Sequence, residues 1–179
     1  MLEAIAEVDG QEARKRVVAA VQGPLAEALR SGALTRVGWY PIAWYGDLHT
    51  AMQKELRGGD EKVRLLGRRS TEIDTRGLLR YVLALSTPSL LFRYGAKIFG
   101  SYLRGGEVAS EHLERKAELR FSNMSEAPDL MFVEWEGGIS SLLEHAGARE
   151  VVVQPAVRKR SSLMRPSSNA PGDIVSIRI

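Results

Sequence analysis

The spacing of apolar residues changes near the middle of the chain, and this change limits the folds that the chain can adopt. Before Gly105 and Gly106, apolar residues recur at intervals of three and four, which is the spacing of an amphipathic helix. After these glycines, apolar and polar residues alternate, as they do in a half-buried strand. Helices that precede strands, instead of alternating with them, predict an α+β fold.

Prolines mark the expected starts of helices in the helical N-terminal half, residues 24–104. Pro24, Pro41 and Pro88 each stand where a first helical turn tolerates the missing N–H group. The helix after Pro41 is expected to run to Leu56.

Two further helices are expected between these segments. Asp60 can cap the first of them. The second opens at Thr71 or at Asp74-Thr75 and continues to Leu85.

The second half of the chain, residues 106–179, predicts an antiparallel sheet of about four strands with one helix crossing between the second and the third. The strand after that helix contains Pro155, which should bend it or confine it to the sheet edge. The expected elements are strands over 107–113 and 116–122, a helix over 130–146, and strands over 150–160 and 174–179.

Length and composition indicate a single folded domain. The chain has 179 residues, of which 44% are hydrophobic and 26% charged, too apolar for a disordered chain. Residues 1–16 lack a firm period and predict a tail or a loose helix, which leaves residues 17–179 as one α+β domain. No apolar run approaches the ~20 residues of a membrane span. The N-terminus does not resemble a signal peptide, so we expect a cytoplasmic protein.

The sequence shows no motif of an enzyme active site, which favours a non-enzymatic role. It contains no cysteine, which excludes disulfides, cysteine-ligated zinc and iron–sulfur clusters. Its histidines, His49, His112 and His145, do not pair at the spacing of a helical metal site. Glu134 and Glu136 should point to different helix faces, which argues against a two-carboxylate mechanism. No nucleophile elbow, P-loop or dinucleotide-binding loop is present.

Two groups of aromatic residues on expected helices are candidates for the wall of an apolar ligand pocket. Aromatic side chains bury large areas, so plain core packing is the alternative interpretation of both groups. The pocket candidates are Trp39, Tyr40, Trp44, Tyr45, Phe92, Tyr94, Phe99 and Tyr102.

Two basic clusters are candidates for contact with an anion or an acidic partner. The net charge of +3 is only mildly basic, which argues against a dedicated nucleic-acid binder and leaves weak binding as the electrostatic option. Charged residues that keep a surface solvated, or protect an edge strand, are the alternative interpretation. The candidate residues are Arg68, Arg69, Arg158, Lys159 and Arg160.

Several short motifs in this order resemble a known superfamily. It includes haem–nitric-oxide-binding domains, vinyl-reductase-type small-molecule-binding domains, aromatic-effector sensor domains of bacterial regulators and small vesicle-tethering subunits. Within it, the chain is most similar to an uncharacterised bacterial family of about this length that is abundant in myxobacteria. The motifs are Val21-Gln22-Gly23, Tyr40-Pro41, Leu66-Gly67-Arg68, Gly105-Gly106-Glu107, and the segment from Glu136-Gly137 to Ala146-Gly147-Ala148.

The chain departs from the ligand-binding patterns of that superfamily. Haem-binding members need a histidine on the long helix and a Tyr-x-Ser-x-Arg clamp, whereas Pro88 to Leu103 contains no histidine and the clamp is missing. The zinc sites and the acyl attachment of other members use cysteines. We therefore expect no cofactor, with the sequence arguing against haem and against zinc.

The resemblance and the aromatic groups together favour a small-ligand-sensing or protein-interaction module of a bacterial signalling system. Its partner would be a small apolar ligand, another protein or a second copy of the chain. A dimeric scaffold without a ligand is the first alternative. Weak binding of nucleic acid or of an acidic partner through the basic clusters is the second.

Overall fold

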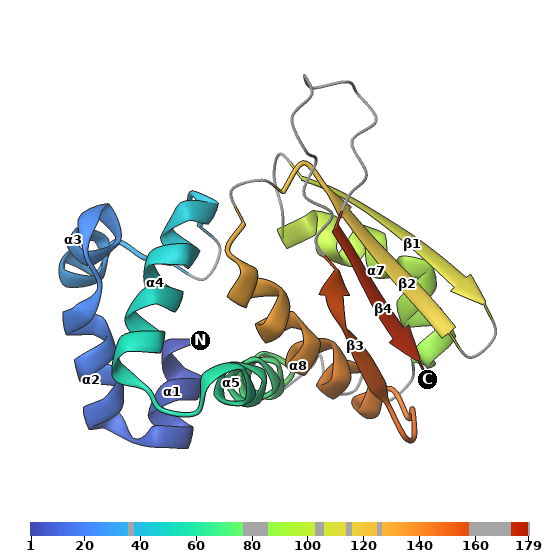
Figure 1. Ribbon diagram of the computed structural model, residues 1–179, viewed down its shortest axis with the longest axis horizontal. Coiled ribbons are helices and arrows are strands. Elements are labelled where there is room, and N and C mark those ends of the chain that lie inside the picture. The colour runs from blue at the N-terminus through green and yellow to red at the C-terminus, as the bar shows by residue number, and fades with distance from the viewer. Residues whose placement is uncertain are drawn as a thin grey trace. The chain divides into compact units, whose positions relative to one another are not determined.

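The computed structural model has the α+β composition that the change of period predicts (Figure 1). It describes residues 1–35, 38–76, 86–102, 106–113, 116–124, 127–157 and 173–178. The helices are α1 (Leu2–Asp9), α2 (Gln11–Ala20), α3 (Gly23–Ser31), α4 (Ile42–Glu55), α5 (Gly59–Asp74), α7 (Pro88–Tyr102) and α8 (Asp129–His145). The strands are β1 (Glu107–Leu113), β2 (Lys116–Ser122), β3 (Val152–Val157) and β4 (Asp173–Arg178).

The chain divides into two compact units. Unit 1 consists of Met1–Ile73 and Glu126–Gly138, and unit 2 of Asp74–Ser125 and Ile139–Ile179. Helix α8 contributes its first part to unit 1 and its second part to unit 2, so this one helix is a component of both.

The first sixteen residues form part of the core of unit 1, where we expected a tail or a loose helix. Ala4 and Ile5 of α1 are 0% exposed, and Ala13 and Val17 of α2 are buried as well. Gly10 separates the two helices with φ of 89°, a backbone conformation that favours glycine. Many apolar residues of this segment are alanines, so the helical spacing of its hydrophobic residues is hard to recognise in the sequence. Their small size nevertheless allows α1 and α2 to pack closely.

Helix boundaries follow the proline and glycine signals at most positions. Pro41 caps the start of α4, and Gly32 ends α3 in a left-handed conformation with φ of 69°. At the start of α7, the Thr87 hydroxyl accepts a hydrogen bond from the Leu90 backbone N–H at 3.2 Å.

Of the two expected starts for the next helix, Thr71 is wrong, because α5 continues through this residue and ends at Asp74, the other expected boundary. The continuation places Ile73 in the core at 8% exposure. Burial of this side chain outweighs the capping tendency of the Thr71 hydroxyl. Residues 77–85 of the next expected helix lie outside the described residues.

Helices α5 and α8 approach so closely that only glycine fits at their contact. A Cβ atom at Gly67 would overlap the backbone carbonyl of Glu134, and one at Gly137 would overlap that of Arg64. The two contacts are reciprocal, since each glycine lies against a carbonyl of the other helix. Without side chains at these two positions, the helix backbones can lie directly against each other.

Unit 2 is built on an antiparallel sheet in the order β1-β2-β4-β3 (Figure 1). Strand β2 alternates strictly, with Ala117, Leu119 and Phe121 buried at 2% exposure or less. Helix α7 packs against β1 and β2. Its Phe99 ring meets the Phe121 ring edge to face, with centroids 5.4 Å apart.

Strand β3 carries both features expected from Pro155. It lies at the edge of the sheet, and its register against β4 shifts between Gln154 and Val157, the interval that contains Pro155. Proline lacks the N–H group that a regular ladder needs, so an edge position with a bulge accommodates it.

Replacing Gly67 or Gly137 with alanine should destabilise unit 1 strongly. The added methyl group must displace a helix backbone, and the free energy of unfolding should fall by about 3 kcal/mol or more. Chemical denaturation monitored by circular dichroism measures the change.

Gly100→Ala is the matched control. Gly100 is also helical, but a Cβ atom there meets nothing within 4 Å. This variant should be neutral or stabilised by up to about 1 kcal/mol. Equal losses in the three variants would contradict the close approach of α5 and α8.

Candidate functional site

A buried cluster of three polar side chains joins α4 to α8 within unit 1. The Tyr45 hydroxyl donates a hydrogen bond to Glu134 Oε1 at 2.6 Å, and His49 Nε2 lies 2.9 Å from Glu134 Oε2. His49 and Glu134 are only 2% and 6% exposed. Tyr45 and His49 are one helical turn apart, so both reach the same carboxylate.

The two ring nitrogens of His49 have different surroundings. Glu134 Oε1 accepts a hydrogen bond from Tyr45, and an ionised carboxylate can only accept, so Nε2 is the donor to Oε2 when Glu134 is ionised. In the described part of the chain, His49 Nδ1 is buried and has no hydrogen-bond partner. The Tyr45 ring stands edge-on to the imidazole, with centroids 4.9 Å apart and planes at 87°.

A second buried carboxylate on α8 is held by α5. Arg64 Nε donates to Glu136 Oε2 at 2.7 Å, and the Glu136 side chain is 5% exposed. This hydrogen bond raises the pKa of Arg64 above its usual value, with a further contribution from the charge of Glu136. The Arg64 side chain is 31% exposed, so its guanidinium also reaches the surface and pairs with Glu61. Glu134 and Glu136 thus have different partners, as expected from their positions on the helix.

The first aromatic group lies in unit 1, and its members have different surroundings. Trp39 and Tyr40 are 46% and 40% exposed, whereas Trp44 packs against the core. The rings of Tyr40 and Trp44 stack at 5.7 Å. Hydrogen bonds from the Thr35 side chain and backbone to its hydroxyl lower the pKa of Tyr40.

The second aromatic group lies in unit 2, on two sides of α7. Phe92 is 3% exposed and stacks on His112 of β1 with ring centroids 5.9 Å apart, and Phe99 also faces the sheet. Tyr94 is 50% exposed. The side chain of Tyr102, a further pocket candidate, lies outside the described residues.

The basic candidates that the structure describes are engaged in ion pairs. Arg68 pairs with Glu72 at 3.3 Å. Arg69 pairs with Glu72 at 2.7 Å and with Glu7 at 2.5 Å, and the hydrogen bond to Glu72 is the main reason that the pKa of Arg69 is raised. Carboxylates thus offset the charge that would attract an anion. The other candidates, Arg158, Lys159 and Arg160, lie outside the described residues.

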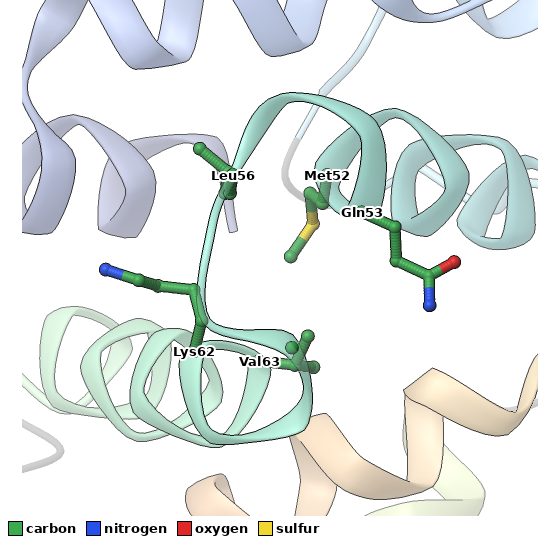
Figure 2. A pocket seen from close by; sticks show the side chains of 6 residues that line it. Met52, Gln53, Leu56, Lys62 and Val63 are labelled. Atoms are coloured by element: carbon green, nitrogen blue, oxygen red, sulfur yellow. The ribbon is translucent and has the colours of Figure 1, made fainter.

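A small pocket of about 170 Å³ lies between the end of α4 and the start of α5. Figure 2 shows Met52 and Val63 pointing toward one another across it, while Gln53 and Lys62 extend away. None of the aromatic or basic candidates lines this pocket. Lys62 pairs with Asp9 at 2.7 Å.

The described residues contain neither a cluster of metal-ligating side chains nor a helix that could span a membrane. No group of three or more histidine, aspartate or glutamate side chains there could hold a metal ion. No described helix is both long enough and apolar enough to cross a membrane.

The buried cluster is the feature that sequence reasoning missed. Tyr45 and His49 share a helical stripe in the sequence, but Glu134 lies 85 residues beyond His49. Glu134 lies between the apolar residues Val133 and Trp135 of α8, which is a local signal that this position is internal.

Of three comparisons with known proteins, only the one with solved structures finds matches. No protein-family model matches it, and no curated protein matches it significantly. Solved structures do match along nearly its whole length. One, described as "Modulating Heme Redox Potential Through Protein-Induced Porphyrin Distortion", has a TM-score of 0.61 at 12% identity and covers 99% of this chain and 95% of its own.

Two other solved structures are H-NOX proteins. The Fe(II) unliganded form of an H-NOX protein mutant from K. algicida has a TM-score of 0.62 at 11% identity, covering 99% of this chain and 91% of its own. A structure concerned with the molecular mechanism of H-NOX activation has a TM-score of 0.59 at 12% identity, with coverages of 99% and 90%. The chain therefore has the fold of the H-NOX proteins, which is the fold that the resemblance implies.

The expectation that the chain has no cofactor is contradicted by these comparisons. It rested on the missing histidine of the long helix and on the missing clamp. The structures that share the fold include one described by its heme and one by its Fe(II) state. At such low identity a fold persists while local motifs diverge, so the absence of a motif was too narrow a criterion.

His49→Leu should lower the free energy of unfolding by about 3–5 kcal/mol, because it leaves one side of a buried carboxylate without its partner. The triple variant Tyr45→Phe, His49→Leu, Glu134→Leu should recover most of this loss, because no buried polar group remains unpaired. Denaturant titration of both variants measures the difference. A triple variant as unstable as the single one would show that packing, rather than pairing, sets the cost.

Glu136→Leu is the matched control on the same helix. Its partner Arg64 can turn toward solvent, so the loss should be smaller, about 1–3 kcal/mol.

Proposed function

We propose that this chain is a ligand-sensing domain of a signalling protein, and that its ligand binds against the outer face of α7. The shared fold supports a sensing role, because one of the matched structures concerns the activation of an H-NOX protein, and a protein that is activated responds to a signal. The observation that carries the site is the outer face itself. Leu90 and Tyr94, one helical turn apart, are 41% and 50% exposed.

The opposite face of α7 explains why this outer face is the site. Phe92, Gly95 and Phe99 follow one another at helical spacing and lie against the sheet. The core contacts of α7 are therefore made by that stripe, and they do not require apolar residues at positions 90 and 94. Neighbouring exposed apolar side chains are typical of surfaces that bind something.

We further propose haem as the cofactor of this domain. Unit 2 presents two side chains of the kinds that ligate haem iron, the phenol of Tyr94 and the imidazole of His112. In the described part of the chain neither makes a hydrogen bond, and both are exposed. When bound, haem would supply an iron centre that takes a small gaseous ligand.

Tyr94 is the residue that we favour to hold the haem. It lies on α7 beside the exposed Leu90, so a flat apolar cofactor could cover both side chains at once. His112 is the less favoured candidate, because one face of its ring is covered by the buried Phe92 on the side of α7 that faces the sheet. The described residues of α7 contain no histidine, so tyrosine replaces it as the donor on this helix.

The finer assignments of the sequence remain part of the proposal. The myxobacterial type of family rests on short motifs only. Trp39 and Tyr40, with Trp44 stacked beneath Tyr40, form a second aromatic surface, which we assign to a partner protein. A dimeric scaffold without a ligand is the alternative that the following experiment tests.

Titration of the purified protein with hemin should produce a sharp Soret band that saturates at one equivalent. Tyr94→Phe removes the phenol oxygen that would hold the iron, and it should shift this band and weaken binding by about tenfold or more. His112→Ala should leave the band in place.

Tyr40→Phe is the matched control, since Tyr40 is a comparably exposed tyrosine in unit 1. A spectrum that stays that of free hemin would contradict the cofactor and favour the scaffold. Loss of the band in His112→Ala alone would keep the cofactor and move the ligand to β1.

A further inference from the structure

Helices α2 and α3 of unit 1 enclose an open groove of about 660 Å³ on the surface. On α2, the residues of the groove recur at intervals of three and four from Gln11 to Ala19, so they form one stripe. The core of unit 1 uses a different stripe of this helix, with Ala13 and Val17 buried. The groove is therefore a second face of α2.

The floor of the groove is apolar and made of small side chains. Val18 and Ala19 come from α2, Ala26 from α3, and Val21 from the connection between the two helices. Ala19 is exposed and Val18 half-buried, so neither contributes fully to the core. Because these side chains are small, the backbone of another helix can approach the floor of the groove closely.

The rim of the groove carries only positive charge. Arg14, Lys15 and Arg30 line it, and no acidic residue does. Arg14 makes no ion pair among the described residues, and Lys15 pairs only with the exposed Glu12. Arg30 donates to the Ala26 carbonyl, which holds its charged group beside the floor.

We propose that this groove binds an amphipathic helix of a partner protein whose apolar stripe is flanked by acidic residues. The apolar floor receives the stripe, and the cationic rim pairs with the flanking carboxylates. The stripe from Gln11 to Ala19 extends over about 12 Å, which matches about two turns of a helix. A contact of this length is typical of weak, reversible association.

The probe is a stapled helical peptide of about four turns, labelled with fluorescein, with leucines at helical spacing and glutamates on both flanks. A second peptide carries lysine in place of each glutamate. Fluorescence anisotropy with the full chain should show binding of the acidic peptide only. Raising the salt concentration should weaken binding, because the rim charges are exposed to solvent.

The double variant Arg14→Glu, Arg30→Glu should weaken binding of the acidic peptide by about tenfold or more. Arg57→Glu is the matched control, because Arg57 is an exposed arginine outside the groove. Circular dichroism confirms that the variants fold. The proposal would be overturned if both peptides bound equally or if neither bound. It would also be overturned if the double variant and the Arg57→Glu control weakened binding equally.

Discussion

The contact between the backbones of α5 and α8 is the constraint on which unit 1 depends. Because Gly67 and Gly137 carry no side chains, each lies directly against a carbonyl of the opposite helix. This close approach places two carboxylates of α8 inside the protein, where they need partners. Glu134 receives hydrogen bonds from Tyr45 and His49 of α4, and Glu136 from Arg64 of α5. Together these bonds fix the rotation of α8 about its axis, because a turned helix would leave both carboxylates buried and unpaired.

Helix α8 belongs to both units, so its position has consequences for each of them. Up to Gly138 it supplies the buried carboxylates of unit 1, and from Ile139 it contributes to unit 2. In unit 2, the two sides of α7 have different surroundings. The sheet-facing side of α7 packs, while its outer side keeps Leu90 and Tyr94 exposed. Neighbouring exposed apolar side chains are typical of surfaces that bind something, and we propose that on this helix they bind the ligand.

Local signals predicted the local structure, and contacts distant in sequence were beyond their reach. Pro41 predicted the start of α4 correctly, and Pro155 predicted a bent edge strand, because proline acts on its own backbone. Thr71 failed as a helix start, because tertiary burial decided whether α5 continued. The partnership of His49 with Glu134 has no local signature, since the two residues meet only after folding. The cofactor expectation failed for the related reason that it relied on one motif, whereas the fold is shared without it.

We propose above all that this chain is a sensor with haem bound against α7. Native mass spectrometry of the protein purified from its own host, together with its visible absorption spectrum, tests that claim most directly. We predict a species heavier than the polypeptide by the mass of one haem, and a Soret band in the same sample. The mass of the bare polypeptide in all charge states, as monomer or dimer, with no visible absorption would contradict it.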